Sequence, residues 1–289
     1  MAALDAVLYE KFIIESTDGK KTVDLKEGVV FFSYFENVFS PHLTAKVQIS
    51  NTGNTVEGED GVMTSVYNGL PLIGGERVII KISGNSPTNK GLDFSDSPEK
   101  YFYVSSITNI LIDAEREAFT LNLISREALT NETVRVGRKF PSSQKISDSV
   151  RDILKKYVKT EKELTINETE NPYGFIGNLK KPFSIITWLA AKSVSSSKGS
   201  STGFLFYETQ FGYNFTSIDD IISGDPYEND YVYAPGIVND RDPKKDFKIK
   251  EATLGSKDLL EKLQRGGYAS QRFYINPVSF KINSKTLFV

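Results

Sequence analysis

The longest pair of strand patterns in the chain lies between residues 101 and 126. Segments 101–112 and 117–126 are rich in β-branched and aromatic residues, and the second alternates apolar and polar positions as FTLNLIS. Only a short polar connection, Asp113 to Arg116, separates them. Such a connection joins antiparallel neighbours, so the two segments predict a long two-stranded ribbon that closes a barrel or a sandwich.

Shorter strand patterns come before this ribbon. Segment 7–15 is followed by Asp18-Gly19, a step typical of tight hairpin turns, with a returning strand expected at 22–25. Segment 43–50 alternates apolar and polar residues, which is typical of a sheet with one solvated face. Two further strands are expected at 29–38 and 77–83, with polar stretches at 51–60 and 84–100. We therefore predict one all-β domain over residues 1–130.

Helical periodicity replaces these strand patterns near Asn131. Apolar residues recur three or four positions apart over 143–158, with a serine at 142 or 143 as the expected N-cap. Pro182 suits the first turn of a second helix, 182–193, because proline lacks the N–H that this position leaves unpaired. These two helices predict a change from all-β to α/β structure.

The second helix leads into an aromatic hairpin. Runs 203–207 and 211–215 are strand patterns, and residues 208–210 form a suitable connection. Ser217 is the expected N-cap of another short helix, with Asp219 and Asp220 in its first turn. We predict a small α/β domain over 131–224, with the hairpin at 203–216. Its expected core comprises Phe183, Ile186, Trp188, Leu189, Phe204, Phe206, Tyr213 and Phe215.

The composition changes again after this domain. Segment 225–245 contains three prolines and many charged residues, which predicts a linker. The start of a second β domain is expected over 246–289, from strand patterns at 247–254, 268–275 and 278–282 and helical turns at 257–264. Because the chain stops in the apolar residues 287–289, we expect this second domain to be incomplete.

Several kinds of chemistry are excluded by the composition. The chain has no cysteine and a single histidine, His42, which excludes disulfides, thiol catalysis and metal sites built from cysteines or several histidines. The formal net charge of −2 gives no electrostatic reason to expect nucleic-acid binding. No apolar run approaches the ~20 residues of a membrane span, and the start of the chain shows no signal-peptide pattern. We predict no cofactor, no metal and no small-molecule ligand.

The acidic residues also favour structural explanations. Glu57, Glu59 and Asp60 lack the alternating oxygen ligands and the glycine of a calcium loop. Glu115 and Glu117 flank the expected tip of the ribbon, a poor place to desolvate an acid. We therefore predict no catalytic residue and no enzyme.

Four segments, taken in order, support a family resemblance. They are YFYVSSITNILIDAEREAFTLNLISREALTN, VGRKFPSSQKISDSVRDILKKY, the stretch 180–222, and DLLEKLQRGGYASQRFYINPVSFKI. This order of elements resembles the baseplate hub proteins of contractile-tailed, T4-type phages and their cyanophage relatives. The resemblance spans roughly residues 20–280 and rests on the pattern of elements, without an invariant motif.

The resemblance implies a mainly β, α+β fold in which a small α/β domain is inserted between two tail-tube-like β-barrel domains. It also implies a homotrimeric ring that adapts a sixfold tail tube to a threefold spike and lets DNA pass without specific binding. The implied partners are a tail spike protein below and a tube initiator or tube protein above, with a baseplate wedge and a tape measure protein as further contacts. The implied location is the virion tail baseplate, after assembly in the host cytoplasm.

Candidate interface residues come from the first strands and the ribbon. They are Val29, Phe31, Tyr34, Phe35, Tyr101, Tyr103, Ile107, Phe119 and Leu121. One alternative function is a carbohydrate-binding tail or cell-surface module that stacks sugars on exposed aromatics of 204–215. Another is a cell-wall hydrolase, which needs two carboxylates roughly 5–9 Å apart in a cleft.

Overall fold

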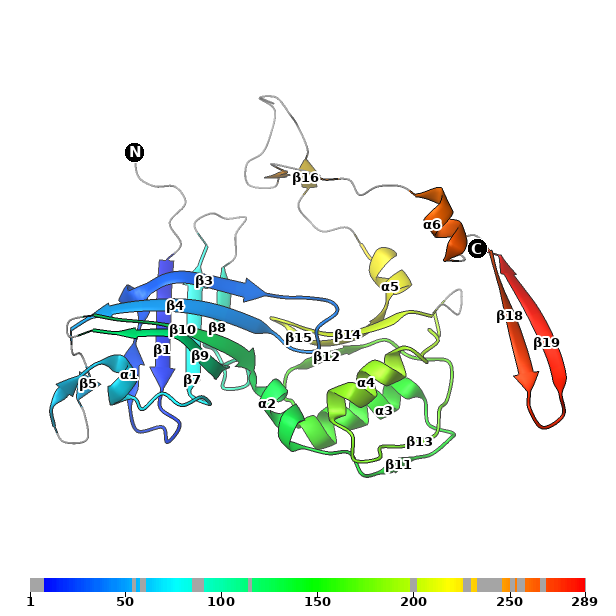
Figure 1. Ribbon diagram of the computed structural model, residues 1–289, viewed down its shortest axis with the longest axis horizontal. Coiled ribbons are helices and arrows are strands. Elements are labelled where there is room, and N and C mark those ends of the chain that lie inside the picture. The colour runs from blue at the N-terminus through cyan, green and yellow to red at the C-terminus, as the bar shows by residue number, and fades with distance from the viewer. Residues whose placement is uncertain are drawn as a thin grey trace. The chain divides into compact units, whose positions relative to one another are not determined.

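The computed structural model describes residues 8–53, 56–57, 61–84, 91–113, 116–197, 202–225, 230–232, 246–249, 253, 258–265 and 269–288. The chain divides into two compact units, Met1–Pro226 and Tyr227–Val289. Within the first unit we name residues 8–125 the sheet module and residues 126–225 the α/β module (Figure 1).

An eight-stranded antiparallel sheet forms the sheet module. Its strand order is β2-β1-β7-β9-β10-β4-β3, and β8 pairs with β7. The strands are β1 (Leu8–Glu15), β2 (Thr22–Asp24), β3 (Val29–Phe35), β4 (Thr44–Thr52), β7 (Arg77–Ser83), β8 (Leu92–Phe94), β9 (Phe102–Ile112) and β10 (Arg116–Ser125). Smaller elements between them are η1 (Lys26–Gly28), β5 (Val56–Glu57), β6 (Met63–Thr64) and α1 (Val66–Gly69). Figure 1 shows β1 and β7 crossing the direction of β3, β4 and β10, so the sheet curls into a half-barrel.

The hydrophobic core of the sheet module lies inside this curl. Alternate residues of each strand point to one face, and most of those facing the core are buried, as Phe12 and Ile14 of β1 illustrate. The rings of Phe12 and Phe32 lie 6.1 Å apart edge to face, although β1 and β3 stand near opposite ends of the strand order. The curl therefore brings both ends of the sheet onto one core.

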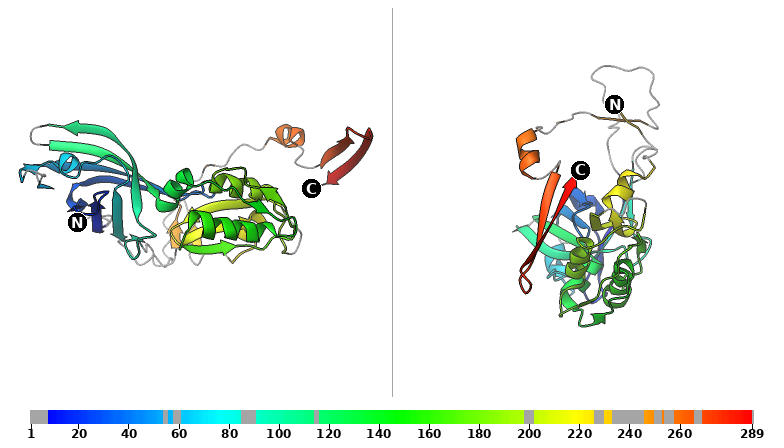
Figure 2. Two further views of the ribbon diagram at one scale, coloured as in Figure 1. Left: turned by 90° about the horizontal axis from the view of Figure 1, so that it is seen from below. Right: turned by 90° about the vertical axis from the view of Figure 1, so that its right-hand side faces the viewer.

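The predicted ribbon is confirmed as β9 and β10, which pair from Ser125↔Phe102 to Glu117↔Ile112. Strand β4 runs along the other side of β10, from Ile124↔Thr44 to Arg116↔Thr52. Figure 2 shows the ribbon as a long curved arm of the sheet. Near its tip the apolar side chains of Ile110, Leu111 and Ile112 are exposed.

The α/β module has a three-stranded sheet of order β12-β15-β14, in which β12 and β15 are parallel. Figure 1 shows helices α3 and α4 against one face of this sheet. Its elements are α2 (Arg126–Thr133), β11 (Lys139–Phe140), α3 (Ile146–Ile153), the π-helical turn η2 (Leu154–Val158), β12 (Glu163–Ile166), β13 (Phe175–Ile176), α4 (Pro182–Ala190), β14 (Phe204–Thr209), β15 (Gly212–Ser217) and α5 (Ile218–Ile222). Side chains of α3, α4, β14 and β15 form a second, separate hydrophobic core.

Local features of this module agree with the sequence in part. Pro182 occupies the first turn of α4, and Ser217 caps α5 by accepting a hydrogen bond from Asp220 N at 3.1 Å, as predicted. The expected serine cap of α3 is wrong. The backbone N–H of Gln144 donates to Pro141 O at 3.2 Å, so this turn delays the helix and Lys145 becomes its N-cap.

The hairpin connection is also shorter than predicted. The turn consists of Gln210 and Phe211, so Glu208 belongs to strand β14. The next residue, Gly212, lets β12 approach β15, because a Cβ there would lie 2.2 Å from Glu163 O. The change in turn length moves Glu208 from a solvated loop into the sheet.

The second unit contains two strand pairs and one helix. Strands β16 (Asp230–Val232) and β17 (Asp246–Lys248) are parallel, and β18 (Ala269–Asn276) pairs antiparallel with β19 (Lys281–Phe288). Asp258 caps α6 (Leu259–Gln264) by accepting hydrogen bonds from two backbone N–H groups. Most of the predicted linker 225–245, and much of the predicted strand 247–254, lie outside the described residues.

The mainly β fold class is confirmed by this architecture. The curled sheet stays open, because the strand order ends at β2 and β3 and no described pairing joins these two strands. Open edges leave backbone N–H and C=O groups available to another strand.

Two leucines of β9 and β10 test how the ribbon divides between core and solvent. We expect Leu121→Ala to lower the free energy of unfolding by about 2–5 kcal/mol, because Leu121 is fully buried and alanine leaves a cavity. Leu111→Ala should change it by less than about 0.5 kcal/mol, because Leu111 is 65% exposed. Urea titration followed by circular dichroism measures both, and equal losses would contradict the described burial.

Candidate functional site at the junction of the modules

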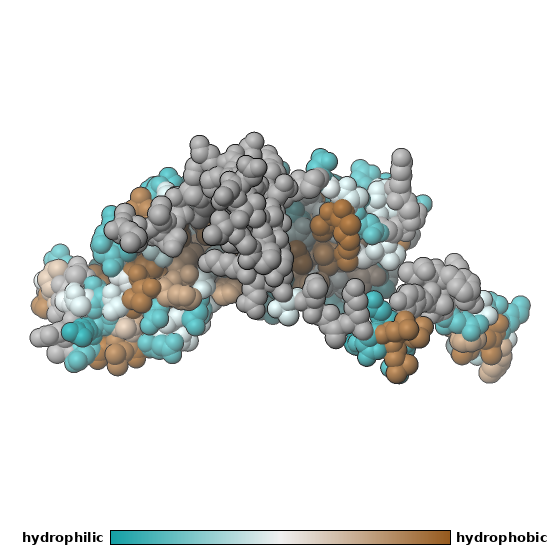
Figure 3. Space-filling view, turned by 90° about the horizontal axis from the view of Figure 1, so that it is seen from above, coloured by the Kyte–Doolittle hydropathy of each residue, from teal (hydrophilic) through white to brown (hydrophobic). Residues whose placement is uncertain are grey.

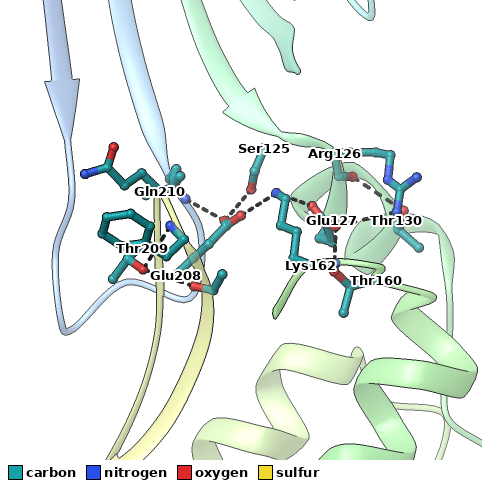
Figure 4. Close-up of polar contacts among 12 residues, drawn as sticks. Ser125, Arg126, Glu127, Thr130, Thr160, Lys162, Glu208, Thr209 and Gln210 are labelled. Atoms are coloured by element: carbon teal, nitrogen blue, oxygen red, sulfur yellow. Dashed lines mark hydrogen bonds and ion pairs between the residues drawn. The ribbon is translucent and has the colours of Figure 1, made fainter. Parts of the chain in front are cut away.

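Glu208 lies at the centre of the contact between the sheet module and the α/β module. Strand β14 carries its side chain inward, where it is fully buried. Glu208 Oε2 accepts hydrogen bonds from Leu43 N at 2.9 Å and from Ser125 Oγ at 2.6 Å. Because Leu43 precedes β4 and Ser125 ends β10, one carboxylate holds two points of the sheet module (Figure 4).

Lys162 connects Glu208 to a second buried carboxylate. Its Nζ donates to Glu208 Oε1 at 2.5 Å and to Glu127 Oε2 at 2.8 Å. Glu127 lies in the first turn of α2 and also accepts a hydrogen bond from Thr160 Oγ1 at 2.8 Å. Both carboxylates are fully buried and the Lys162 side chain is only 7% exposed. We name Glu127, Lys162 and Glu208 the junction triad.

The charges around the junction triad balance. The guanidinium of Arg126 lies 3.5 Å from Glu127 Oε1, so two cations face two carboxylates. Burial alone would lower the pKa of Lys162, but Glu208 and Glu127 outweigh this effect and hold that pKa above its ordinary value. The ammonium therefore stays charged, and its loss would leave two carboxylates buried without their shared partner.

The ring of Tyr213 covers the triad. Lys162 Nζ lies 5.9 Å from the ring centroid, within the range of a cation–π contact. Burial, together with the charges of Glu208 and Glu127, raises the pKa of Tyr213 well above its ordinary value. The phenol is therefore held neutral.

The triad is arranged for structural support. A general acid or base must reach the atom whose proton it moves, and neither carboxylate reaches solvent. Each carboxylate oxygen already accepts at least one hydrogen bond from the protein. The described residues contain no group of three or more acidic, histidine or cysteine side chains that could hold a metal ion. None of the described helices combines the length and apolar character of a membrane span.

Two further polar contacts lie near the triad, one within the α/β module and one between the modules. Asn131 Oδ1, at the end of α2, accepts a hydrogen bond from Phe183 N in the first turn of α4 at 2.8 Å. Glu36 Oε1, just after β3, accepts one from Gln210 N at the tip of the β14–β15 hairpin at 2.5 Å. The first contact fixes α2 against α4, and the second joins the β14–β15 hairpin to the sheet module.

Two other buried carboxylates organise loops of the sheet module. Glu117 was expected to stay solvated, and this is wrong: it is buried and accepts hydrogen bonds from Val66 N at 2.8 Å and Tyr67 N at 3.1 Å. These donors are free N–H groups of the first turn of α1, which compensate the charge. Glu76 in turn accepts from Ile73 N at 2.7 Å and Gly74 N at 3.0 Å. Both carboxylates therefore stabilise local backbone.

The structure separates the predicted interface residues into three groups. Phe31 and Phe35 of β3 are 53% and 54% exposed. Half-buried positions are Val29, Tyr34, Tyr101, Tyr103 and Ile107. Phe119 and Leu121 are buried in the core of the sheet module, which corrects their prediction as interface residues, because the inward face of β10 packs against the curled sheet.

Seven of the eight residues expected in the α/β core are buried there, namely Phe183, Ile186, Leu189, Phe204, Phe206, Tyr213 and Phe215. Trp188 is the exception: it is 40% exposed and makes edge-to-face contacts with Tyr173 and Phe175 on the outer side of α4. The carbohydrate alternative required solvent-facing rings in 204–215. Only Phe211, in the hairpin turn, has that exposure among these aromatics.

The junction triad itself was missed from the sequence. Its members are spread over residues 127 to 208, and the polar residues next to them, such as Thr209 and Gln210 beside Glu208, also suit a solvated surface. The one available signal is the alternation of β14, where Phe204, Phe206 and Glu208 share a face. A shortened hairpin turn would have extended that buried face to Glu208.

Neither a protein-family model nor a curated protein matches this chain. Among solved structures, the chain is similar to the 43 kDa tail protein of prophage MuSo2 from Shewanella oneidensis, with a TM-score of 0.51 and 12% sequence identity. The likeness covers 80% of this chain and 60% of that protein, so this chain spans less than two thirds of it. At such low identity, the similarity concerns the fold alone.

Two other solved structures are more distantly similar. One is the prophage tail protein gp18 from Listeria monocytogenes EGD-e, with a TM-score of 0.42 and 10% identity, covering 96% of this chain and 67% of that one. The other is the E. coli c3393 protein, a type VI secretion component described as similar to the T4 tail proteins gp27 and gp5. Its TM-score is 0.43 at 9% identity, covering 80% of this chain and 52% of that one. Neither likeness is close enough to carry a conclusion about this chain.

Removing the shared cation tests the junction triad. We expect Lys162→Met to lower the free energy of unfolding by about 3–5 kcal/mol, because it leaves Glu127 and Glu208 buried without their bridge. The matched control is Lys139→Met, since Lys139 is exposed on β11, and it should change stability by less than about 0.5 kcal/mol. Urea unfolding followed by the fluorescence of the single tryptophan measures both. A similar small effect for both variants would contradict a stabilising triad.

Stability should also fall in alkali. Lys162 and Tyr213 have folded pKa values above their unfolded ones, so their contribution is complete below pH ~10 and is lost as pH rises through the folded values. Burial raises the pKa of Tyr34 in the same direction. Tyr213→Phe should make the alkaline decline shallower, because one titrating group is gone. Urea midpoints measured between pH 7 and pH 11 test this, and an unchanged slope in the variant would refute the role of Tyr213.

Proposed function

We propose that this chain is a structural subunit of a phage tail and acts as a central hub protein of the baseplate. In this role three copies form a ring that adapts a sixfold tail tube to a threefold spike and lets DNA pass. The fold likeness to the MuSo2 tail protein carries the tail assignment. The hub role and the threefold ring rest on the resemblance of the four sequence segments.

The chemistry of the junction supports a structural role. Glu127 and Glu208 form the most deeply buried carboxylate pair of the α/β module, and Lys162 lies between them. A hydrolase instead needs one carboxylate on each side of an accessible bond. A subunit that transmits force between tube and spike needs modules that do not shift against one another. The hydrogen bonds from Leu43 and Ser125 to Glu208, which Lys162 holds in place, provide that restraint.

Exposed apolar strands also support assembly into a larger structure. The outer side of β3 exposes Phe31 and Phe35, and the ribbon tip exposes Leu111. Figure 3 shows brown apolar side chains at the surface on one face of the molecule. Exposed large apolar side chains and free strand edges are typical of surfaces that a partner covers. A ring of copies would cover both.

The remaining partners follow from the hub role. A spike protein would bind below the ring, and a tube initiator or tube protein above it, with a baseplate wedge and a tape measure protein as further contacts. The ring would be assembled in the host cytoplasm and located in the virion tail, without enzymatic activity or a bound cofactor.

Solution mass tests the proposed ring. We expect light scattering coupled to gel filtration to give three times the 32.3 kDa mass of the chain, either alone or in complex with the product of the neighbouring gene, tested as the spike. The experiment compares the purified chain, the neighbour and their mixture at several concentrations.

A monomer in both conditions would contradict the trimeric hub. A mass of two chains would likewise contradict threefold symmetry, because a threefold ring cannot be built from a closed dimer alone. A trimer that forms only with the spike would support the adaptor role and place its assembly trigger in that partner.

A further inference from the structure

The second unit has no interior of its own among the residues described. Every described side chain from 258 to 284 is exposed, including large apolar ones. These apolar residues are Leu259, Leu260, Leu263, Phe273, Tyr274, Ile275, Val278, Phe280 and Ile282. A two-stranded hairpin is at best marginally stable in water unless it packs on another element. The β18–β19 hairpin therefore needs a partner.

The two faces of this hairpin differ. Cross-strand pairs Phe273↔Ser284 and Ile275↔Ile282 place three apolar side chains on one face. Phe273 is 62% exposed, Ile275 is 66% exposed and Ile282 is 65% exposed. The opposite face carries Tyr274 and the polar residues that pair beside it, such as Asn283. The partner must therefore offer an apolar surface on one side only.

Strand β3 of the sheet module offers such a surface. It ends the strand order, and among the described strands β4 alone pairs with it. Phe32 and Tyr34 face the core, whereas Phe31 and Phe35 lie on the outer face with Ser33 between them. The lengths also match, with seven residues in β3 and eight in each strand of the hairpin.

The charges of the two surfaces favour pairing of the hairpin with β3 over pairing of two hairpins or of two β3 strands. The hairpin segment 269–288 contains three basic residues and no acidic residue. The exposed Glu27 and Glu36 flank β3, and Lys26 beside Glu27 is paired with Asp24 at 3.6 Å. The edge therefore keeps a negative balance even with Lys46 on neighbouring β4. Two hairpins packed together would bring their basic residues close to one another, which is unfavourable. Two β3 strands paired antiparallel would bring Glu27 of one copy near Glu36 of the other.

We propose that the β18–β19 hairpin of one copy extends the sheet of a second copy by pairing with its β3 strand. Phe273, Ile275 and Ile282 then continue the outer apolar face that Phe31 and Phe35 begin. This pairing rests on the proposed function, in which neighbouring copies form the ring, and it identifies the surfaces that join them.

Cysteine cross-linking tests the pairing directly, because the chain has no cysteine of its own. One variant carries Ser33→Cys on β3 and the other carries Ser284→Cys on the apolar face of the hairpin. The two are coexpressed with different affinity tags, purified through both tags and treated with a short bis-maleimide. We expect a covalent dimer that contains both tags. The matched control replaces Ser33→Cys by Ser184→Cys, an exposed serine of α4 that lies outside the proposed surface.

The results distinguish the proposed pairing of the hairpin with β3 from the proposed threefold ring. A trimeric mass with the Ser33–Ser284 cross-link supports the pairing. A trimeric mass without it, or with equal cross-linking in the control, overturns the pairing and leaves the ring standing. A monomeric mass overturns the ring itself. A cross-link that forms only within one chain carrying both substitutions shows that the hairpin covers its own copy, and also overturns the proposal.

A pair of substitutions on opposite hairpin faces gives a second test. Phe273→Asp should weaken association by roughly tenfold or more, because it places a charge in the apolar contact. Tyr274→Asp, one residue away on the other face, should leave association nearly unchanged. Unfolding of the first unit, followed by tryptophan fluorescence, should be the same in both and in the parent chain. Equal association of the two variants would overturn the proposed face.

Discussion

The salt bridges between Lys162 and the carboxylates of Glu127 and Glu208 are the interaction on which the first unit depends. They lie where β10 passes into α2 and where Glu208 of β14 accepts a hydrogen bond from Leu43, just before β4. They fix Glu208, and Glu208 accepts the hydrogen bonds from Leu43 N and Ser125 Oγ that link the two separate hydrophobic cores of the modules. Charged groups buried in this way tolerate little change of geometry, because a small shift leaves an ion without its partner. The triad, together with the hydrogen bonds that Glu208 accepts from the sheet module, therefore favours one arrangement of the two modules.

The same structure leaves other surfaces unfinished. The curl of the sheet brings Phe12 and Phe32 onto one core, yet it does not join β2 to β3 by any described pairing. Edges of this kind are a hazard in a monomer and a means of assembly in a subunit. The β18–β19 hairpin has the complementary property, an apolar face without a core. A first unit with an open sheet edge, together with an unsupported hairpin, fits the proposal that neighbouring copies cover both.

Much of the fold follows from local patterns. The alternation around Leu121 and the short polar connection after Ile112 predicted the ribbon, and Pro182 marked the start of α4. Local patterns failed where a contact between distant segments decides whether a side chain is buried. Phe119 looked like a strand residue free to face a partner, but the curl places it in the core. Tryptophan is a large apolar residue that suits a core, yet Trp188 lies on the outer side of α4 beside Tyr173.

The sequence by itself determined the mainly β class, the ribbon, the helix–hairpin order and the absence of cysteine chemistry, because periodicity, turn residues and composition act over a few neighbouring positions. Only the tertiary structure decided which charged side chains are buried and which are solvated. Glu117 and Glu208 resemble solvated glutamates until the backbone N–H groups of Val66 and Leu43 are placed beside them. A carboxylate is stable in the interior only where donors from distant segments converge on it. That convergence depends on the path of the whole chain, which no local pattern contains.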